Sequence, residues 1–255
     1  RLLSDQNVFL AVYLANSWIQ EKALLSDIDQ ECLRKLKDVF DQDNISGVIH
    51  DVQKRLQEIL NDVDSFFHIN VFFKPKGSKD GKTVFRPIHT ASLIDQIAMV
   101  AMLQILVYET NAEGKLIPSE LSRMLPSNFY GNRIAYDGEH LFKPWKEQYH
   151  QYTADANDRL IQFAQTGIYK YEITLDLQNF FPSIDPKILF QFIQKKFPLK
   201  WSPEDTATAR TILRKLLLFE LEPLTCDEQR WYYGEESGRQ LKDQQLFAKG
   251  LPQGL

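Results

Sequence analysis

Asp176 is the residue whose type and position most directly permit chemistry, because it is a carboxylate near the end of a strand-like segment. From residue 170 to residue 185 the chain reads KYEITLDLQNFFPSID, and apolar and polar side chains alternate at its start. This period of two predicts a strand whose polar face carries Asp176. A carboxylate held by a rigid strand can bind a metal ion without rearranging, so the pattern predicts a divalent-cation ligand.

A second carboxylate, Asp185, lies nearby in the sequence but has a different context. It precedes Pro186, and apolar residues follow at helical spacing. An Asp followed by Pro is the expected pair at the start of a helix, so we predict an N-cap role for Asp185. The two carboxylates are therefore not expected to form a general acid/base pair.

A short cationic segment is the other candidate for chemistry. Residues 65–90 contain five Lys and Arg and one Asp, a local net charge of +4. Residues 67–73 alternate as in a strand, residues 74–82 are rich in turn formers, and residues 83–88 read as a returning strand. The pattern predicts a hairpin with a cationic tip, which is either a solvated loop or a surface that faces phosphates.

The elements around these segments are mostly helical. Residues 1–64 have apolar residues at helical spacing and a net charge of −5, and residues 93–108 form an apolar helical stretch. An aromatic-rich helical stretch holds Trp145, Tyr149, Tyr152 and Phe163, which we expect to lie in the core rather than to stack on bases. Residues 204–219 predict a further helix.

Composition is ordinary for a globular protein: of 255 residues, 44% are hydrophobic and 25% charged, and the net charge is −4. Cys32 and Cys226 match no metal-ligand spacing and are expected to be reduced thiols. The apolar run at residues 97–103 is too short to cross a bilayer, and no signal peptide opens the chain. We therefore expect a soluble cytoplasmic protein. The first residue is Arg1, and we expect a segment of a longer parent.

The sequence DLQNFFPSI from Asp176 onward resembles the first catalytic-aspartate motif of reverse transcriptases, especially bacterial enzymes of retrons, group II introns, abortive infection and phage defence. The resemblance implies that Asp176 and the backbone of Leu177 bind two Mg²⁺ ions. It implies that Phe181 lies under the incoming sugar and excludes a 2′-hydroxyl, although a simple core role for Phe181 remains an alternative.

Two further segments follow the same family's order. Lys74-Pro-Lys76-Gly and Arg86-Pro resemble the fingers that grip the triphosphate, and it stays open whether Lys74 or Lys76 faces the nucleotide. The final GLPQGL resembles the Leu-Pro-Gln-Gly motif of the palm, which implies that Gln253 and Gly254 border the nucleotide and the template base.

The resemblance covers residues 66–255 and implies an α+β fold, the right-hand polymerase fold with fingers and part of an antiparallel palm sheet packed by helices. We expect a helical N-terminal extension at 1–65, fingers at 66–170 and a truncated palm at 171–255. A lineage-specific insertion is expected at about 198–247. Residues 130–133, YGNR, also resemble a loop of bacterial defence reverse transcriptases.

The implied activity is RNA-directed DNA synthesis, the transfer of dNTPs to a primer 3′-hydroxyl, in bacterial anti-phage defence. Implied partners are an RNA template or associated non-coding RNA, a DNA primer and dNTPs, with no membrane; self-association is compatible with the sequence. The chain contains no Asp-Asp pair, so we expect this segment alone to be inactive. The alternatives are a template-independent or protein-primed DNA-synthesising enzyme, an inactive RNA-binding scaffold, and an RNA polymerase, against which the aromatic Phe181 argues.

Overall fold

The structure is a computed structural model that combines helices with a small sheet, as the expected α+β class requires. It describes residues 1–22, 24–42, 44–79, 81–126, 128–168, 171, 173, 180–234 and 246–254. The helices are α1 (Asp5–Glu21), α2 (Asp27–Asp41), α3 (Ile45–Asn61), α4 (Leu93–Val107), α5 (Glu120–Arg123), α6 (Trp145–Thr166), α7 (Phe180–Ser183), α8 (Pro186–Gln194), α9 (Pro203–Leu217) and α10 (Cys226–Tyr233). The strands are β1 (Phe67–Lys79), β2 (Lys82–Ala91), β3 (Tyr108–Thr110), β4 (Leu116–Pro118) and β5 (Phe219–Leu221).

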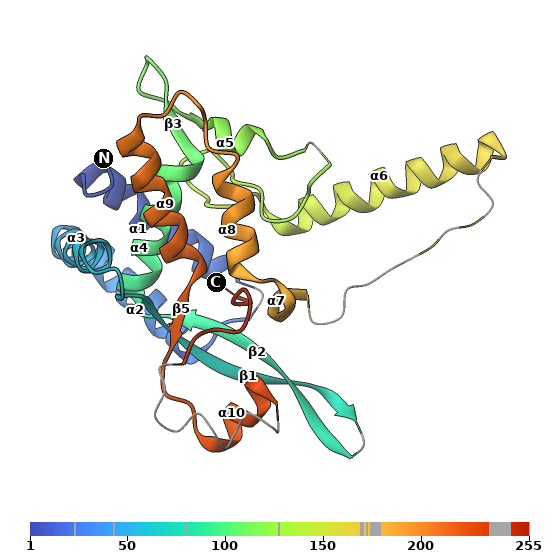
Figure 1. Cartoon of the computed structure of the whole chain (residues 1–255), viewed down its shortest axis with the longest axis horizontal. Coiled ribbons are helices and arrows are strands. Elements are labelled where there is room, and N and C mark those ends of the chain that lie inside the picture. The colour runs from blue at the N-terminus through green and yellow to red at the C-terminus, as the bar shows by residue number, and fades with distance from the viewer. Residues whose placement is uncertain are drawn as a thin grey trace.

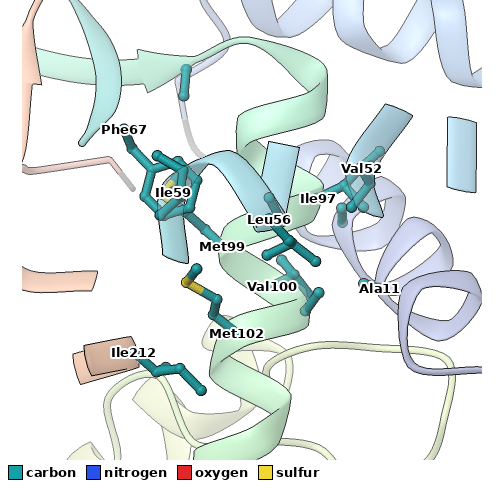
Figure 2. Close-up of a cluster of buried hydrophobic side chains, with 14 of the residues drawn as sticks. Ala11, Val52, Leu56, Ile59, Phe67, Ile97, Met99, Val100, Met102 and Ile212 are labelled. Carbon is teal, nitrogen blue, oxygen red and sulfur yellow. The ribbon is translucent and has the colours of Figure 1, made fainter. Parts of the chain in front are cut away.

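Helix α4 is the centre of the core (Figure 2). Its side chains are apolar around most of its circumference, and a helix of that kind is stable only when neighbours cover it on several sides. Helices α1, α3 and α9 provide this cover, with Leu56 of α3 and Ile212 of α9 fully buried beside it. The helices expected in residues 1–64 are confirmed, and they share one core with α4.

The predicted hairpin is confirmed, but its strands are longer than expected. Residues 74–82 were expected to form a turn, whereas β1 continues to Lys79 and β2 begins at Lys82. A register shift between Pro75 and Gly77 lets the strands stay paired through this turn-rich sequence. The hairpin extends from the body of the molecule (Figure 1).

The third strand of the sheet is β5, which pairs in parallel with the start of β1, so the strand order is β2-β1-β5. Lys215 of α9 donates from Nζ to the carbonyl oxygens of Asp62 and Val63, at 2.8 and 3.0 Å, and so ties α9 to the link between α3 and β1. Residues of the expected insertion thus supply both a core helix and a strand. β2 remains at the edge of the sheet.

The expectation that the aromatic residues of 145–163 form core is wrong. They lie on α6, which has no buried residue; Trp145, Tyr149, Tyr152 and Phe163 are 55%, 58%, 52% and 41% exposed. In Figure 1 the helix projects from the body, and within the described residues no helix or strand packs extensively against it. Helical spacing predicted the helix correctly, but burial depends on a neighbour that sequence periodicity does not reveal.

Four smaller expectations concern local features, and three of them fall on described residues. Asp185 is the N-cap of α8, and its carboxylate accepts from the Lys187 N–H at 2.8 Å, as predicted. Both cysteines are free, with Cys32 buried and Cys226 exposed. The strand expected around Asp176 falls mostly outside the described residues; Tyr171 and Ile173, which are described, are exposed and belong to no strand. None of the described helices is long and apolar enough to cross a membrane.

Candidate functional site

A cavity of about 560 Å³ lies where β2, α7, α10 and the segment 249–253 meet. Four of the six residues predicted to bind a nucleotide line it: Lys76, Arg86, Phe181 and Gln253. These residues come from three segments that are widely separated in the sequence. The chain fold therefore brings the hairpin, the segment after Asp176 and the Leu-Pro-Gln-Gly segment to one place.

The hairpin contributes the cations, and the structure separates the two candidate lysines. Lys74 lies opposite Arg86 in the strand register, but it is Lys76 that lines the cavity together with Arg86. Lys76 sits within the register shift, where a bulge changes the direction of the strand and of its side chains. Pro87 also lines the cavity, on an edge strand where its missing N–H leaves no ladder hydrogen bond unmade.

The Leu-Pro-Gln-Gly segment is attached to the free edge of β2. The His89 N–H donates to the Gln253 carbonyl oxygen at 2.8 Å, and the Gln253 N–H donates to His89 Nδ1 at 2.9 Å. Gly254 has φ of +106°, and a Cβ there would lie 2.9 Å from the His89 carbonyl oxygen. The missing side chain allows the segment to lie close against β2, and Gly254 itself is not among the residues that line the cavity.

The same segment also contacts α7. The Leu251 N–H donates to the Phe181 carbonyl oxygen at 3.0 Å. Gly250 has φ of +68°, and a Cβ at this position would lie 2.2 Å from that oxygen, which is far inside van der Waals contact. A residue with a side chain at 250 would force α7 and the segment apart, so this glycine determines the position of Phe181 in the cavity wall.

The side chain of His89 on β2 is hydrogen-bonded both to the Leu-Pro-Gln-Gly segment and to α10. It is buried, and because Nδ1 accepts from Gln253, the neutral imidazole carries its proton on Nε2 and donates it to Tyr232 Oη at 2.9 Å. Tyr232 Oη also accepts from the Lys249 N–H at 3.0 Å. Burial lowers the pKa of His89 to about 4, although the nearby Gln253 carbonyl oxygen partly offsets this effect. Burial raises the pKa of Tyr232 to about 12, so both groups are neutral near pH 7.

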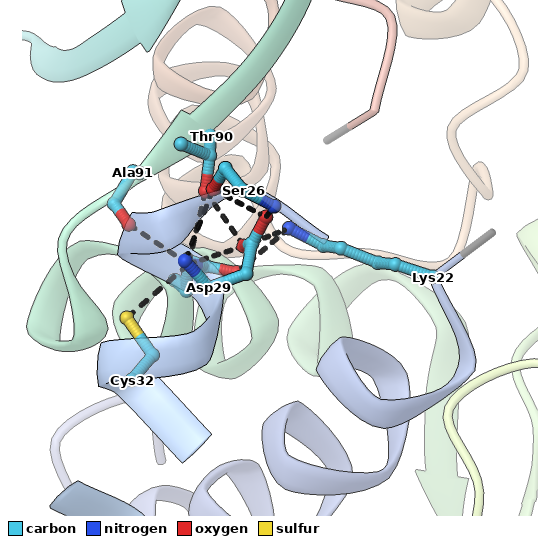
Figure 3. Close-up of polar contacts among 7 residues, drawn as sticks. Lys22, Ser26, Asp29, Cys32, Thr90 and Ala91 are labelled. Carbon is cyan, nitrogen blue, oxygen red and sulfur yellow. Dashed lines mark hydrogen bonds and ion pairs between the residues drawn. The ribbon is translucent and has the colours of Figure 1, made fainter. Parts of the chain in front are cut away.

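A second buried network holds the end of β2 one residue further on (Figure 3). Asp29 of α2 accepts from Thr90 Oγ1 at 2.7 Å and forms an ion pair with Lys22 at 2.8 Å. Burial alone would raise the pKa of Asp29, but the bonds from Lys22, Thr90 and Ser26 outweigh it and lower that pKa. Burial also lowers the pKa of Lys22, against the attraction of Asp29. The N-terminal helices thereby fix the strand that carries His89.

Several cavity residues were missed in the sequence analysis. His89, Lys249 and the α10 residues Trp231 and Tyr232 all line the cavity, and residues 231–232 had been assigned to an insertion. The Trp-Tyr-Tyr run was a visible signal of a packed or binding surface, and Lys249 directly precedes Gly250. Nothing in the local sequence marks His89 as buried, because its burial results from contacts with residues 232 and 253.

The electrostatics of the cavity favour an anion. Among its described lining residues are three cations, Lys76, Arg86 and Lys249, and no carboxylate. Cations that converge on one cavity bind phosphate groups well, and Arg offers a planar fork for them. The geometry can therefore hold a polyphosphate beside aromatic side chains.

The metal site predicted at Asp176 and the backbone of Leu177 lies outside the described residues. Among the residues that are described, no group of three His, Cys, Asp or Glu side chains could hold a metal ion. The donor set for Mg²⁺ therefore stays a prediction from the sequence.

Comparison of the chain with protein-family models, with curated proteins and with solved structures finds no match.

Proposed function

We propose that this chain is the fingers and part of the palm of a reverse-transcriptase-like DNA polymerase, and that the cavity receives the incoming dNTP. The observation that carries the proposal is the convergence of Lys76, Arg86, Phe181 and Gln253 on one cavity. These residues belong to three separate sequence motifs that follow one another in the order typical of that family. Three unrelated surface motifs would have no reason to share a cavity.

In this proposal each side chain has a role that suits its chemistry. Arg86 and Lys76 hold the triphosphate and offset charge that develops during transfer. The ring of Phe181 lies beneath the sugar and leaves no room for a 2′-hydroxyl, and Gln253 borders the base. The primer 3′-hydroxyl loses its proton to water and its oxygen forms a new bond to the α-phosphorus, the bond from that phosphorus to the bridging oxygen of the β-phosphate breaks, and pyrophosphate leaves.

Two Mg²⁺ ions at Asp176 and the Leu177 backbone would neutralise phosphate charge in the complete site. What the described residues contribute is binding, orientation and exclusion of water. The defence role and the RNA and DNA partners belong to the same proposal and are supported by the sequence resemblance alone.

The experiment that tests the proposal is nucleotide binding, because it does not require the chain to polymerise. We expect dATP to bind in isothermal titration calorimetry, and Arg86→Ala to weaken binding at least about tenfold, the loss of roughly one charge-assisted contact. Arg86 is exposed, so its removal should leave the fold intact. Arg210→Ala, a matched change at an exposed arginine of α9 that does not line the cavity, should leave the affinity unchanged.

Failure of the wild-type chain to bind dATP, with the protein folded, would contradict the proposal. Equal losses of dATP affinity in the Arg86 and Arg210 variants would also contradict it, because the nucleotide would then not bind specifically in the cavity.

A further inference from the structure

Trp231 is an exposed aromatic residue held in a fixed orientation at the wall of the cavity. Its ring centroid lies 4.5 Å from that of Phe85, with an angle of 33° between the planes, and 5.4 Å from that of Phe73 at 72°. Phe73 and Phe85 contact each other edge-to-face across the hairpin. The two phenylalanines support the indole from the hairpin side, while 48% of the Trp231 surface stays exposed.

This exposure is not needed for packing α10 against the hairpin. Tyr232, the next residue, already fastens α10 through its bonds to His89 and Lys249, and it is only 7% exposed. The uncovered part of the indole lies at a cavity that Lys76 and Arg86 also line, so a ligand held in the cavity can contact the ring.

The groups that share the cavity with Trp231 indicate the ligand. Lys76 and Arg86 supply positive charge for phosphates, and the described lining holds no carboxylate that would repel them. A flat aromatic surface beside phosphate-binding cations is the combination that recognises nucleotides, because every base has a π-face that can stack. A phosphate without a base would use the cations and leave the indole exposed.

We propose that Trp231 is a stacking surface for a nucleobase whose phosphates are held by Lys76 and Arg86. This inference rests on the proposed function and extends it, because it assigns base recognition to α10, a part of the chain outside the three motifs. The base belongs either to the free nucleotide or to an unpaired nucleotide of a single strand, and the two sources share the same chemistry.

The test compares ligands with and without a base. The probes are dATP, inorganic tripolyphosphate, a single-stranded oligo(dA) and the same oligomer with abasic sites. Trp231→Leu should weaken a base-bearing ligand at least about tenfold and leave tripolyphosphate unchanged, whereas Arg86→Ala should weaken both dATP and tripolyphosphate. Trp145→Leu removes a tryptophan of similar exposure on α6, outside the cavity lining, and should change none of these affinities.

Fluorescence provides a readout that does not depend on the leucine variant being folded. We expect dATP to quench indole emission in the wild type, tripolyphosphate not to quench it, and the conservative variant Trp231→Phe to lose the quenching while it keeps most of the affinity. Quenching that is unchanged in Trp231→Phe would overturn the inference.

The outcomes separate this inference from the proposal on which it rests. If the wild type binds neither dATP nor tripolyphosphate, both fail. If Arg86→Ala weakens both ligands and Trp231→Leu weakens neither dATP nor oligo(dA), only the stacking role fails. Loss confined to dATP assigns the base to the free nucleotide, and loss confined to oligo(dA), absent with the abasic oligomer, assigns it to a strand.

Discussion

Gly250, Gly254 and His89 determine the shape of the cavity although none of them is expected to bind a ligand by its own charge. The two glycines allow backbones to approach within distances that any side chain would prevent. His89 joins β2 to residues 232 and 253 through both ring nitrogens. The positions of Phe181 and Gln253 therefore depend on two glycines that no larger residue could replace without moving the backbone, and on the hydrogen bonds of His89.

His89 leads to a prediction about pH. Its pKa is about 4 in the folded protein and 6.5 in the unfolded chain, so between these values the unfolded state binds more protons. Stability from this residue is therefore complete above pH 6.5 and is lost as pH falls toward 4. The free energy of unfolding should fall by about 2 kcal/mol from pH 7 to pH 5 through this group alone.

Urea unfolding at pH 7 and pH 5 measures this effect. His89→Gln should abolish that part of the pH dependence, whereas His50→Gln, at an exposed histidine of α3, should retain it. An equal decrease in stability in the wild type and the His89 variant would show that the buried imidazole does not resist protonation.

Among the elements, the helices α4 and α6 differ in how their apolar side chains are covered. α4 is apolar around most of its circumference and is covered by α1, α3 and α9, whereas α6 carries aromatic and aliphatic side chains among mostly polar ones and has no buried residue. The ring of Tyr149 lies 6.3 Å from that of Tyr152, one turn further along the same helix. In the described structure, α6 therefore contributes little to the core.

A pair of alanine substitutions tests this difference. Leu56→Ala, at a fully buried position of α3 beside α4, should lower the free energy of unfolding by about 2–5 kcal/mol, because it leaves a cavity. Tyr149→Ala, at a position that is 58% exposed, should change it by less than about 0.5 kcal/mol. Urea unfolding at pH 7 measures both, and a comparable loss in the two variants would mean that α6 is covered in solution.

For the whole molecule, the N-terminal helices and the cavity are parts of one packed unit. Asp29 and Lys22 form a buried ion pair that is bonded to Thr90 at the end of β2 and to Gln96 of α4 (Figure 3). A substitution at Asp29, which is far from the cavity residues in sequence, should therefore lower the stability of the protein and loosen β2, the strand that lines the cavity.

Asp29→Ala should lower the free energy of unfolding by about 3–5 kcal/mol, because Lys22 would be left as a buried charge without its partner. Asp51→Ala, at an exposed carboxylate of α3, is the matched control and should have an effect below about 0.5 kcal/mol. Urea unfolding compares the two, and a loss below 1 kcal/mol for Asp29→Ala would show that water reaches Lys22 and that the network does not hold β2.

The sequence by itself determined the features that depend on local patterns. These are the helices of residues 1–64, the hairpin, the apolar helix α4 and the cap at Asp185, and each follows from periodicity or from the conformational preferences of neighbouring residues. Through resemblance to a family whose motifs occur in this order, it also singled out six nucleotide-binding candidates, of which Lys76, Arg86, Phe181 and Gln253 line the cavity and Lys74 and Gly254 do not.

Only the tertiary structure decided which of these parts meet and which side chains are buried. The convergence on one cavity, the presence of Lys76 rather than Lys74 in its lining, the hydrogen bonds of His89, the position of Trp231 at the cavity wall and the exposure of α6 all depend on how residues far apart in the chain are arranged. Local sequence specifies which helix or strand a segment forms. Burial and hydrogen-bond partners are supplied by other segments, so they are set only by the tertiary structure.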